Sequence, residues 1–365
     1  MMKVLHVLNE LKPSGAETML CIAGSTFASN GITAEVLSTG QEIGNYAPNL
    51  ESTGYTLKHI PFVQTPLFFL RLYRLMQQGK YDVIHLHTER ANFWIGLVAL
   101  SARPKRVLRT IHSNFCFGGH LRIRRMLQRR FLEFLGVTHV AISTSVQQNE
   151  LKTFGLKTRY VPNWYEDTRF TPATVAERRQ ARADFGIPPD RTVIITVGNC
   201  SEIKNHESLL HALAMLPLEN RPIYLHVGNE NVAKSERKLA VELGLENSVR
   251  FLGPLTDIRP ALVSADIFVM PSLYEGFGIA AIEGLAMGLP AIFTDAPGLR
   301  DFRAEYDGLV YADPDASSLH DALLVLLLET KETRLQRSEN YQDISKQLYS
   351  VRNGVSGYLK IYSDD

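Results

Sequence analysis

Residues 266–292 are D-I-F-V-M-P-S-L-Y-E-G-F-G-I-A-A-I-E-G-L-A-M-G-L-P-A-I, and they decide the fold more than any other stretch. The apolar run from Ile267 to Met270 predicts a buried strand of a parallel sheet. Apolar residues at helical spacing then occupy 280–287 and end at a glycine, which predicts a helix. A new apolar run starts at Ala291 and predicts the next strand. This order of strand, turn and helix is typical of an α/β fold.

Two glutamates flank the predicted turn. Glu275 ends the strand side of the turn E-G-F-G, and Glu283 lies within the helix. Ligands of open α/β sheets bind at this edge, where free helix amides attract phosphate and glycines allow close approach. Carboxylates accept hydrogen bonds from sugar hydroxyls, so the pattern suits a nucleotide sugar. Two glutamates at this spacing also occur by chance on ordinary helices.

In this context the chain resembles the retaining glycosyltransferases of family 4, also called glycosyl transferases group 1. That family has two Rossmann-like domains facing across a cleft, the GT-B fold, and a glutamate followed after seven residues by another. The resemblance implies that Glu275 binds hydroxyls of the donor sugar and that Glu283 binds the ribose. It also places Gly276, Phe277 and Gly278 in the donor-binding turn.

Length and composition fit a two-domain globular protein. The chain has 365 residues, 45% hydrophobic and 21% charged, with a net charge of +1 that gives no reason to expect nucleic acid as a partner. The cysteines Cys21, Cys116 and Cys200 are far apart, which favours a reducing cytosol over a disulfide framework. The first residues do not resemble a signal peptide, so a cytoplasmic location is expected.

Strand and helix patterns alternate in both halves of the chain and predict two parallel, doubly wound sheets. The segment 162–172 interrupts this alternation and is expected to link the domains. We expect a first domain of residues 1–165 joined by a C-terminal helix at about 342–365, and a second domain of residues 170–340. The resemblance implies that the first domain binds the acceptor and the second the donor.

Two further segments are candidate phosphate sites. Residues 12–17, K-P-S-G-A-E, form a turn in which Gly15 can place an anion at a helix N-terminus, although any such turn can contain one glycine. Residues 197–206, V-G-N-C-S-E-I-K-N-H, match a family segment with an arginine and a lysine. Lys204 matches that lysine, which neutralises the donor diphosphate, whereas Asn199 replaces the arginine. The alternative for Lys204 is a solvated surface lysine.

The first half contains two histidine motifs at predicted strand ends and one basic helix. His112 matches a family histidine that faces the donor sugar, and His87 is a candidate on the acceptor side. Both could instead satisfy loop carbonyls. Residues 118–135 mix arginines with apolar residues, and such a helix can bind an anionic membrane surface. The candidate membrane or acceptor residues on it are Arg124, Arg125, Arg129 and Arg130. An ordinary helix with its apolar face on the sheet is the alternative.

The predicted function is transfer of a sugar, with retention of configuration, from a nucleotide diphosphate to a glycan or lipid-linked acceptor. This activity would serve surface polysaccharide or glycolipid synthesis, with peripheral contact with the inner face of the plasma membrane. His112, Lys204 and Glu275 are the expected catalytic residues. No cofactor and no metal are expected, because the sequence predicts no carboxylate cluster aimed at the diphosphate, and Lys204 and helix N-termini can neutralise it instead. The alternatives are a sugar-nucleotide epimerase of the same fold and a catalytically weak nucleotide-sugar-binding protein, the latter motivated by Asn199.

Overall fold

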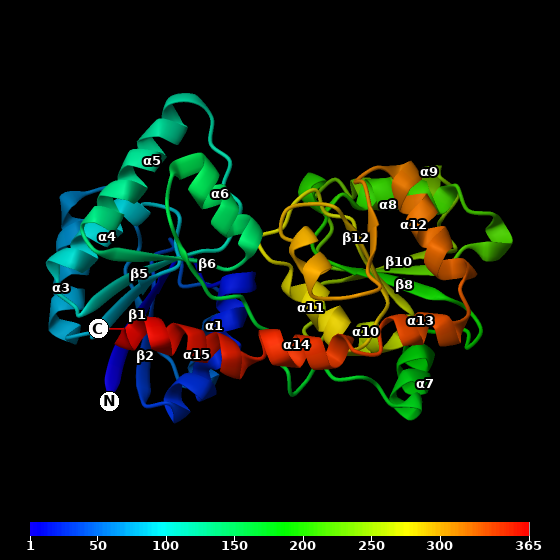
Figure 1. Ribbon diagram of the computed structural model, residues 1–365, viewed down its shortest axis with the longest axis horizontal. Coiled ribbons are helices and arrows are strands. Elements are labelled where there is room, and N and C mark those ends of the chain that lie inside the picture. The colour runs from blue at the N-terminus through cyan, green and yellow to red at the C-terminus, as the bar shows by residue number, and fades with distance from the viewer. Residues whose placement is uncertain (365) are drawn as a thin grey trace. The chain divides into compact units, whose positions relative to one another are not determined.

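The computed structural model describes residues 1–364 and divides the chain into two compact units (Figure 1). Unit 1 contains residues 1–164 and the chain from 351 onward, and unit 2 contains residues 165–350. Each unit has one parallel sheet with helices on both faces, so the predicted Rossmann-like α/β class is confirmed. None of the helices within residues 1–364 has both the length and the apolar character that a membrane span requires.

Unit 1 has a seven-stranded sheet in the order β3-β2-β1-β4-β5-β6-β7. Its strands are β1 (Met2–Leu8), β2 (Ile32–Ser38), β3 (Thr56–His59), β4 (Val83–Leu86), β5 (Arg106–Ile111), β6 (Val137–Ala141) and β7 (Arg159–Tyr160). Its helices are α1 (Gly15–Ser29), α2 (Ala47–Ser52), α3 (Pro66–Gly79), α4 (Asn92–Ser101), α5 (Gly119–Phe134), α6 (Thr144–Phe154) and α15 (Val351–Ser363).

Unit 2 has a six-stranded sheet in the order β10-β9-β8-β11-β12-β13. Its strands are β8 (Val193–Val197), β9 (Ile223–Val227), β10 (Val249–Gly253), β11 (Ile267–Met270), β12 (Ala291–Thr294) and β13 (Val310–Ala312). Its α-helices are α7 (Val175–Asp184), α8 (His206–Ala214), α9 (Ser235–Glu242), α10 (Arg259–Ser264), α11 (Ile279–Ala286), α12 (Ala316–Leu328), α13 (Lys331–Arg337) and α14 (Tyr341–Tyr349). Three short 3-10 helices are η1 (Glu202–Lys204), η2 (Leu218–Asn220) and η3 (Arg300–Ala304).

The two faces of the unit 1 sheet carry different sets of helices. On one face α1, α2 and α15 pack on the strands, with Phe27 and Trp164 in the core between them. On the other face α3, α4 and α5 pack on the same strands through residues such as Phe68, Ile95 and Leu132. Because central parallel strands are covered on both faces, β1, β4 and β5 are mostly apolar. Their polar positions are Lys3, His6, His85, Arg106, Arg109 and Thr110.

The C-terminal segment differs from the single helix expected at about 342–365. The helix breaks at Ser350, where the backbone is extended, and only α15 belongs to unit 1. The expected assignment of residues 342–349 to the first domain is therefore wrong. The reason is packing, since Tyr349 lies with its ring 5.4 Å from that of Phe277 in unit 2. In α15, by contrast, Gly354 leaves room for the indole of Trp164, which a Cβ at that position would strike.

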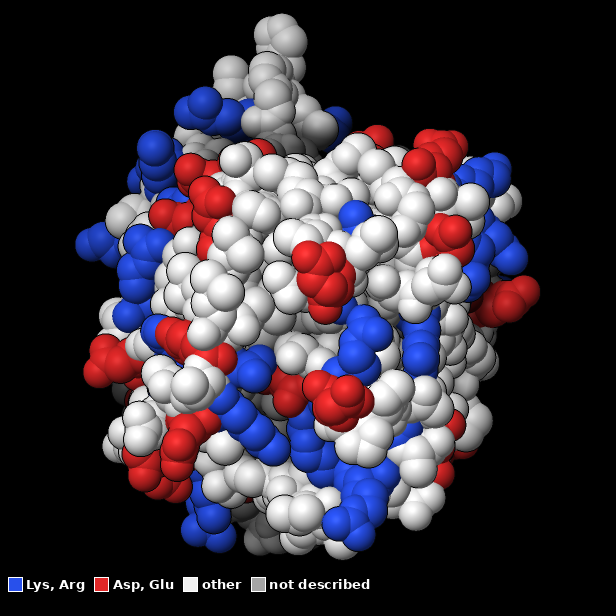
Figure 2. Space-filling model, turned by 90° about the vertical axis from the view of Figure 1, so that its right-hand side faces the viewer, with Lys and Arg blue, Asp and Glu red and all other residues white. Residues whose placement is uncertain are grey.

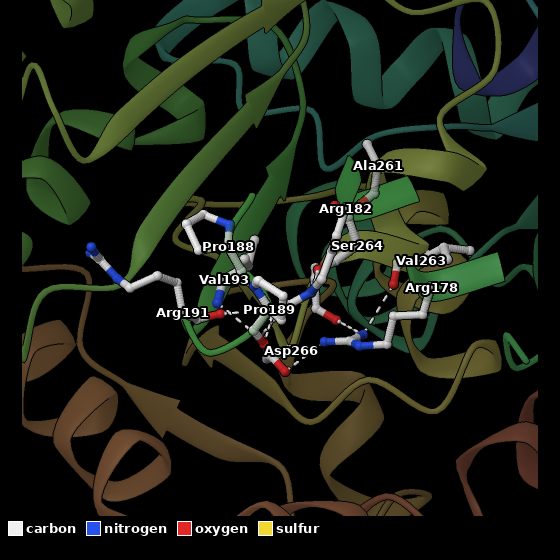
Figure 3. Close-up of polar contacts among 11 residues, drawn as sticks. Arg178, Arg182, Pro188, Pro189, Arg191, Val193, Ala261, Val263, Ser264 and Asp266 are labelled. Carbon is white, nitrogen blue, oxygen red and sulfur yellow. Dashed lines mark hydrogen bonds and ion pairs between the residues drawn. The ribbon is translucent and has the colours of Figure 1, made fainter. Parts of the chain in front are cut away.

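Arginines of α7 fasten the amino-terminal end of the unit 2 sheet (Figure 3). Asp266, just before β11, accepts hydrogen bonds from Arg178 at 2.6 Å, from Arg182, and from the backbone N–H of Val193 at 2.9 Å. Arg182 also donates to the carbonyl oxygen of Ser264 in α10 at 3.1 Å, and to those of Pro189 and Arg191 in the loop before β8, both at 3.0 Å. These contacts join the amino-terminal ends of β8 and β11 to each other and to α7.

Charge is mixed on the face of the molecule that Figure 2 draws. On the face drawn in Figure 2, Lys and Arg side chains alternate with Asp and Glu, and neither sign forms one continuous area. This agrees with the net charge of +1.

Candidate functional site

The carboxyl ends of β8, β11 and β12 bring three loops of unit 2 together. The loop after β11 is tied to η1 by the N–H of Leu273, which donates to the Ile203 carbonyl at 2.8 Å. It is tied to the loop after β12 by the N–H of Glu275, which donates to the Pro297 carbonyl at 2.9 Å. Gly298 permits this approach, because a Cβ there would collide with the carbonyl oxygen of Glu275. The predicted strand–turn–helix edge is therefore a braced cluster of loops.

Lys204 and Glu275 form an ion pair within this cluster. The Lys204 Nζ lies 2.6 Å from Glu275 Oε1, and the hydroxyl of Ser272 donates to the same oxygen at 2.7 Å. The side chains are only 26% and 12% exposed, so the alternative of a solvated surface lysine is wrong. Gly198 makes the space for the lysine stem, since a Cβ there would lie 3.3 Å from its Cε. The pair places one cation and one carboxylate at a single point of the sheet edge.

Glu283 lies four residues after the N-terminal end of α11 and is buried without a hydrogen-bond partner for its carboxyl group among the described residues. Burial raises the pKa of this carboxyl group to about 8, opposed by the positive charge of Arg169 and assisted by the negative charge of Glu166. Arg169 itself is paired with Glu166 at 3.3 Å and with Asp257. A carboxyl group with an unfulfilled hydrogen-bonding capacity is a candidate for binding a ligand's hydroxyls.

Asn199 has a structural use in place of the arginine of the resembled pattern. Its Oδ1 accepts hydrogen bonds from the backbone N–H of Asn229 at 2.8 Å and from the Asn229 side chain at 3.2 Å. This links the loops that follow β8 and β9. Gly228 lets them meet, because a Cβ there would strike the Gly198 carbonyl. The asparagine side chain thus braces the loop that leads to Lys204 and contributes no charge.

Two predicted donor-site residues have different surroundings from those expected. The side chain of Phe277 is buried, with its ring 5.8 Å from Phe302 and 5.4 Å from Tyr349, so it forms core and only its backbone can face a ligand. Gly15 begins α1, but the buried carboxyl group of Glu17 lies in the first turn of the same helix. Burial raises the pKa of Glu17, and its group already faces that helix end.

In unit 1 three histidines form a chain of hydrogen bonds. His87 Nδ1 lies 2.9 Å from His112 Nε2, and His87 Nε2 lies 3.0 Å from His6 Nδ1. Neighbouring His85 bonds the hydroxyls of Tyr362 at 2.8 Å and Thr110 at 2.7 Å. Burial lowers the pKa of His6 to about 3 and that of His112 to about 4, and it lowers the pKa of His87 well below the usual value. The rings are therefore neutral at pH 7.

A neutral chain of this kind has two arrangements that satisfy both contacts, because each ring carries one proton. In one, His112 donates to His87 and His87 donates to His6, which leaves His112 Nδ1 as an acceptor. In the other, all donors reverse and His112 Nδ1 carries the proton.

His6, His85 and His87 have nitrogens close enough to suggest a metal site. However, both ring nitrogens of His85 already face hydroxyls, so the set is better explained as a hydrogen-bond network.

Helix α5 is not arranged as either prediction supposed. Arg129 points inward and is about 1% exposed, bound to Glu150 at 3.0 Å and to Glu89 at 3.2 Å. Its assignment as a membrane or acceptor residue is therefore wrong, because two carboxylates hold it inside the unit. The ordinary alternative holds for Arg122, Arg124 and Arg130, which are exposed, and fails for several apolar residues, which face outward as well. These exposed apolar residues are Ile123, Leu127, Phe131 and Phe134.

Comparisons with known proteins cover both units. Residues 177–343 match the family Glycosyl transferases group 1, and residues 13–169 match Glycosyltransferase Family 4. The chain belongs to the group 1 glycosyltransferases. It is 29% identical over 309 residues to EpsF, named as a glycosyltransferase of Bacillus subtilis (strain 168), covering 80% of this chain and 79% of EpsF.

Another relative is an Escherichia coli enzyme named UDP-Gal:alpha-D-GlcNAc-diphosphoundecaprenol alpha-1,3-galactosyltransferase. It is 25% identical over 281 residues, covering 73% of this chain and 72% of the enzyme. Among solved structures, Anabaena Alr3699/HepE in complex with UDP and glucose superposes with a TM-score of 0.85 at 19% identity, covering all of both chains. That likeness establishes the GT-B fold of this glycosyltransferase.

Some site residues of the glycosyltransferase were missed by sequence reasoning. Arg169 lies in the segment expected to be a linker, yet it is the cation that most influences Glu283. Gly298 and Gly228 both have positive φ, of 86° and 147°, and both permit loop contacts at the site. Glycines just after predicted strands were the available signal. Arg169 had no comparable signal, since Asp257 and Glu283 are distant from it in the sequence.

Proposed function

We propose that this glycosyltransferase moves a sugar from a nucleotide-diphosphate donor to a hydroxyl group of a glycan or lipid-linked acceptor. The bond between the anomeric carbon and the β-phosphate oxygen breaks, and a bond from that carbon to the acceptor oxygen forms. The acceptor's proton passes to the departing diphosphate, and the anomeric configuration is retained. The observation that carries the proposal is the Lys204–Glu275 pair at the edge of the unit 2 sheet.

Each member of the pair has a separate role in this proposal. Lys204 exchanges its contact with Glu275 for the donor diphosphate and stabilises the leaving group, as a preorganised cation does. Glu275 then accepts hydrogen bonds from the donor sugar, and Glu283 accepts them from the ribose hydroxyls. His112 presents its Nδ1 to the sugar, as an acceptor or as a donor according to which of the two arrangements of the histidine chain is present. Because the cation is a lysine, the proposed reaction needs no metal.

A shift in melting temperature tests the donor site first. Nucleotide diphosphates and their sugar conjugates are screened, uridine compounds first because Alr3699/HepE was solved with UDP. A ligand that binds only the folded chain raises its melting temperature. A selective rise that persists in EDTA supports a metal-free donor site. A rise that EDTA abolishes refutes the metal-free part, and no rise with any compound refutes the donor site.

Asn199 favours one second candidate, a protein that binds nucleotide sugars with little turnover. The asparagine leaves Lys204 as the cation of its segment, whereas the resembled pattern has two cations there. Donor binding without release of nucleoside diphosphate across a panel of acceptors would favour this candidate. Release that depends on an added acceptor would favour transfer and would exclude an epimerase.

We also propose that the outward face of α5 lies on an anionic membrane surface. Leu127 and Phe134 are 60% and 84% exposed, and Arg124 and Arg130 are exposed on the same helix. Apolar side chains flanked by arginines suit the interface of such a membrane. The test is sedimentation with vesicles that contain anionic phospholipid. The Leu127→Gln/Phe134→Gln variant should sediment less than the wild type, whereas a matched change at exposed Leu218 and Leu328 of unit 2 should not differ. Equal sedimentation of all three proteins would refute the membrane contact.

A further inference from the structure

A groove of about 1000 Å³ lies on unit 1 beside α3, α4 and α5. It begins at the segments that follow β3 and β4, which supply Phe62 and Arg90, and it continues along the helices past Trp94 to Arg124 and Arg125. The groove therefore starts at the carboxyl edge of the sheet, where ligands of α/β domains bind. It is separate from the loop cluster of unit 2 that holds Lys204.

One part of the groove is an aromatic wall. Trp94 is 53% exposed, and its ring packs against Phe93 at 5.1 Å and Phe69 at 6.5 Å between centroids. Leu97 and Val98 continue this wall along α4. An indole left open to water in a concave apolar setting is typical of a binding site rather than of a core. The wall matches a long apolar chain.

The other part of the groove is cationic. Arg90, Arg124 and Arg125 line it, and no acidic residue is among the described residues that line it. The guanidinium groups of Arg90 and Arg125 are held over the rings of Phe62 and Phe117, at 5.2 and 5.5 Å. The Nε of Arg125 is buried and has no hydrogen-bond partner within residues 1–364. Arginines placed by stacking with unused donors are suited to a phosphate group.

We propose that this groove binds one lipid-linked phosphate, with the apolar chain against Trp94 and the phosphate or diphosphate at Arg124 and Arg125. The inference rests on the proposed function, because it identifies the acceptor as a sugar carried on such a lipid. It is distinct from the membrane contact of α5, since Ile123, Leu127 and Phe134 do not line the groove. The groove beside α3, α4 and α5 thus binds a single lipid, and the outer face of α5 contacts the bilayer.

Tryptophan emission gives a direct test. The chain has two tryptophans, and Trp164 is fully buried, so a change in the environment of Trp94 dominates the signal. The probe is farnesyl diphosphate below its micelle concentration, compared with farnesol and with inorganic pyrophosphate. We expect a saturable blue shift with farnesyl diphosphate. We expect weaker binding of farnesol and no blue shift with pyrophosphate alone.

The arginine variants separate the groove from general charge. Arg124→Gln/Arg125→Gln should weaken farnesyl diphosphate binding about tenfold or more, as expected for lost charge-assisted hydrogen bonds. The matched control Arg122→Gln/Arg130→Gln removes the same charge from the same helix outside the groove and should bind like the wild type. Equal weakening in both double variants, or no blue shift in the wild type, would overturn the proposal. So would a shift produced by anionic vesicles but not by the monomeric probe.

Failure of the proposed function would give a different result. The donor screen reports on unit 2 by melting temperature, whereas the probe reports on unit 1 by emission. Binding of farnesyl diphosphate without any donor binding would leave a lipid-phosphate groove in a protein that is not a transferase. Donor binding with no emission change would retain the transferase and remove the lipid-linked acceptor.

Discussion

The affinity for nucleoside diphosphate should rise with pH because of Glu283. Burial raises the pKa of this carboxyl group to about 8 in the free chain, so at pH 7 about ten molecules in eleven carry it protonated. The ribose assignment needs the carboxylate, which accepts hydrogen bonds without donating. Binding therefore removes the proton, and the dissociation constant should fall about tenfold per pH unit below the free pKa.

The size of the effect follows from that pKa value. Between pH 6.5 and 8.5 the fraction of free chains in the carboxylate form rises about 25-fold if the pKa of Glu283 falls below 6 in the complex. This corresponds to about 1.9 kcal/mol of binding free energy. At pH 7 binding should release about 0.9 protons from this group.

Isothermal titration calorimetry with UDP, in two buffers of different ionisation enthalpy, measures both the affinity and the proton release. Glu283→Gln is the matched control, because UDP's own phosphate titrates equally with either protein. The wild type should gain about 25-fold in affinity relative to this control over the pH range. Parallel pH profiles for the two proteins would refute the role of Glu283 in binding.

The free chain gives an independent check on the pKa of Glu283. A carboxyl group whose folded pKa is raised above the unfolded value contributes its stability below pH 4.5 and loses it as the pH rises through about 8. Glu283→Gln should therefore stabilise unit 2 more at pH 8.5 than at pH 5. If it does not, the pKa is ordinary and the binding prediction loses its basis. If it does but the UDP profiles are parallel, the carboxyl group is buried yet does not bind the ribose.

Three other outcomes follow from the described contacts. Lys204→Ala should lower turnover by about 10²–10³-fold with the donor that the melting screen identifies. The control Lys238→Ala, on the exposed face of α9, should leave turnover unchanged. Near-normal turnover of Lys204→Ala would refute the phosphate role. Glu150→Ala should lower the unfolding free energy of unit 1 by about 3–5 kcal/mol because Arg129 loses its buried partner, measured by urea unfolding with tryptophan emission, since both tryptophans lie in unit 1. A loss below about 1 kcal/mol would contradict this. Unit 1 should also lose stability as pH falls from about 6.5 toward 4, by about 1.4 kcal/mol per pH unit for each buried neutral histidine. His6→Asn should reduce this slope by about 1.4 kcal/mol per pH unit. An unchanged slope would show that the pKa of His6 is not lowered in the folded chain.

The sequence predicted the alternation of elements, because most central strands are apolar runs and many turns carry a glycine or proline. Through the resemblance to family 4, it also predicted that Lys204 and Glu275 belong to one site, and the two side chains are paired in the structure. It could not predict their direct contact. That contact depends on Gly198 and Gly298, whose missing Cβ atoms matter only once neighbouring loops are in place.

Asn199 shows a second limit of sequence reasoning. The resembled pattern has an arginine at this position, so Asn199 lacks the positive charge of that pattern. In the structure it accepts two hydrogen bonds from Asn229 and joins the loops after β8 and β9. The partner lies 30 residues away, and no local pattern pairs two asparagines at that separation. The substitution therefore removes a cation but also stiffens the loop that leads to Lys204.

Helix α5 shows why an amphipathic pattern alone does not give a helix its orientation. The spacing of arginines and apolar residues allows either set to face the sheet, and single-sequence reasoning favours apolar residues inside. The actual orientation is decided by Glu150 and Glu89, which lie 21 and 40 residues from Arg129 and hold it in the interior. Leu132 completes the inward face, so the core beside α5 includes none of Ile123, Leu127 and Phe134. Packing within unit 1 therefore gives no reason for the exposed apolar stripe, and the proposed membrane contact rests on that observation.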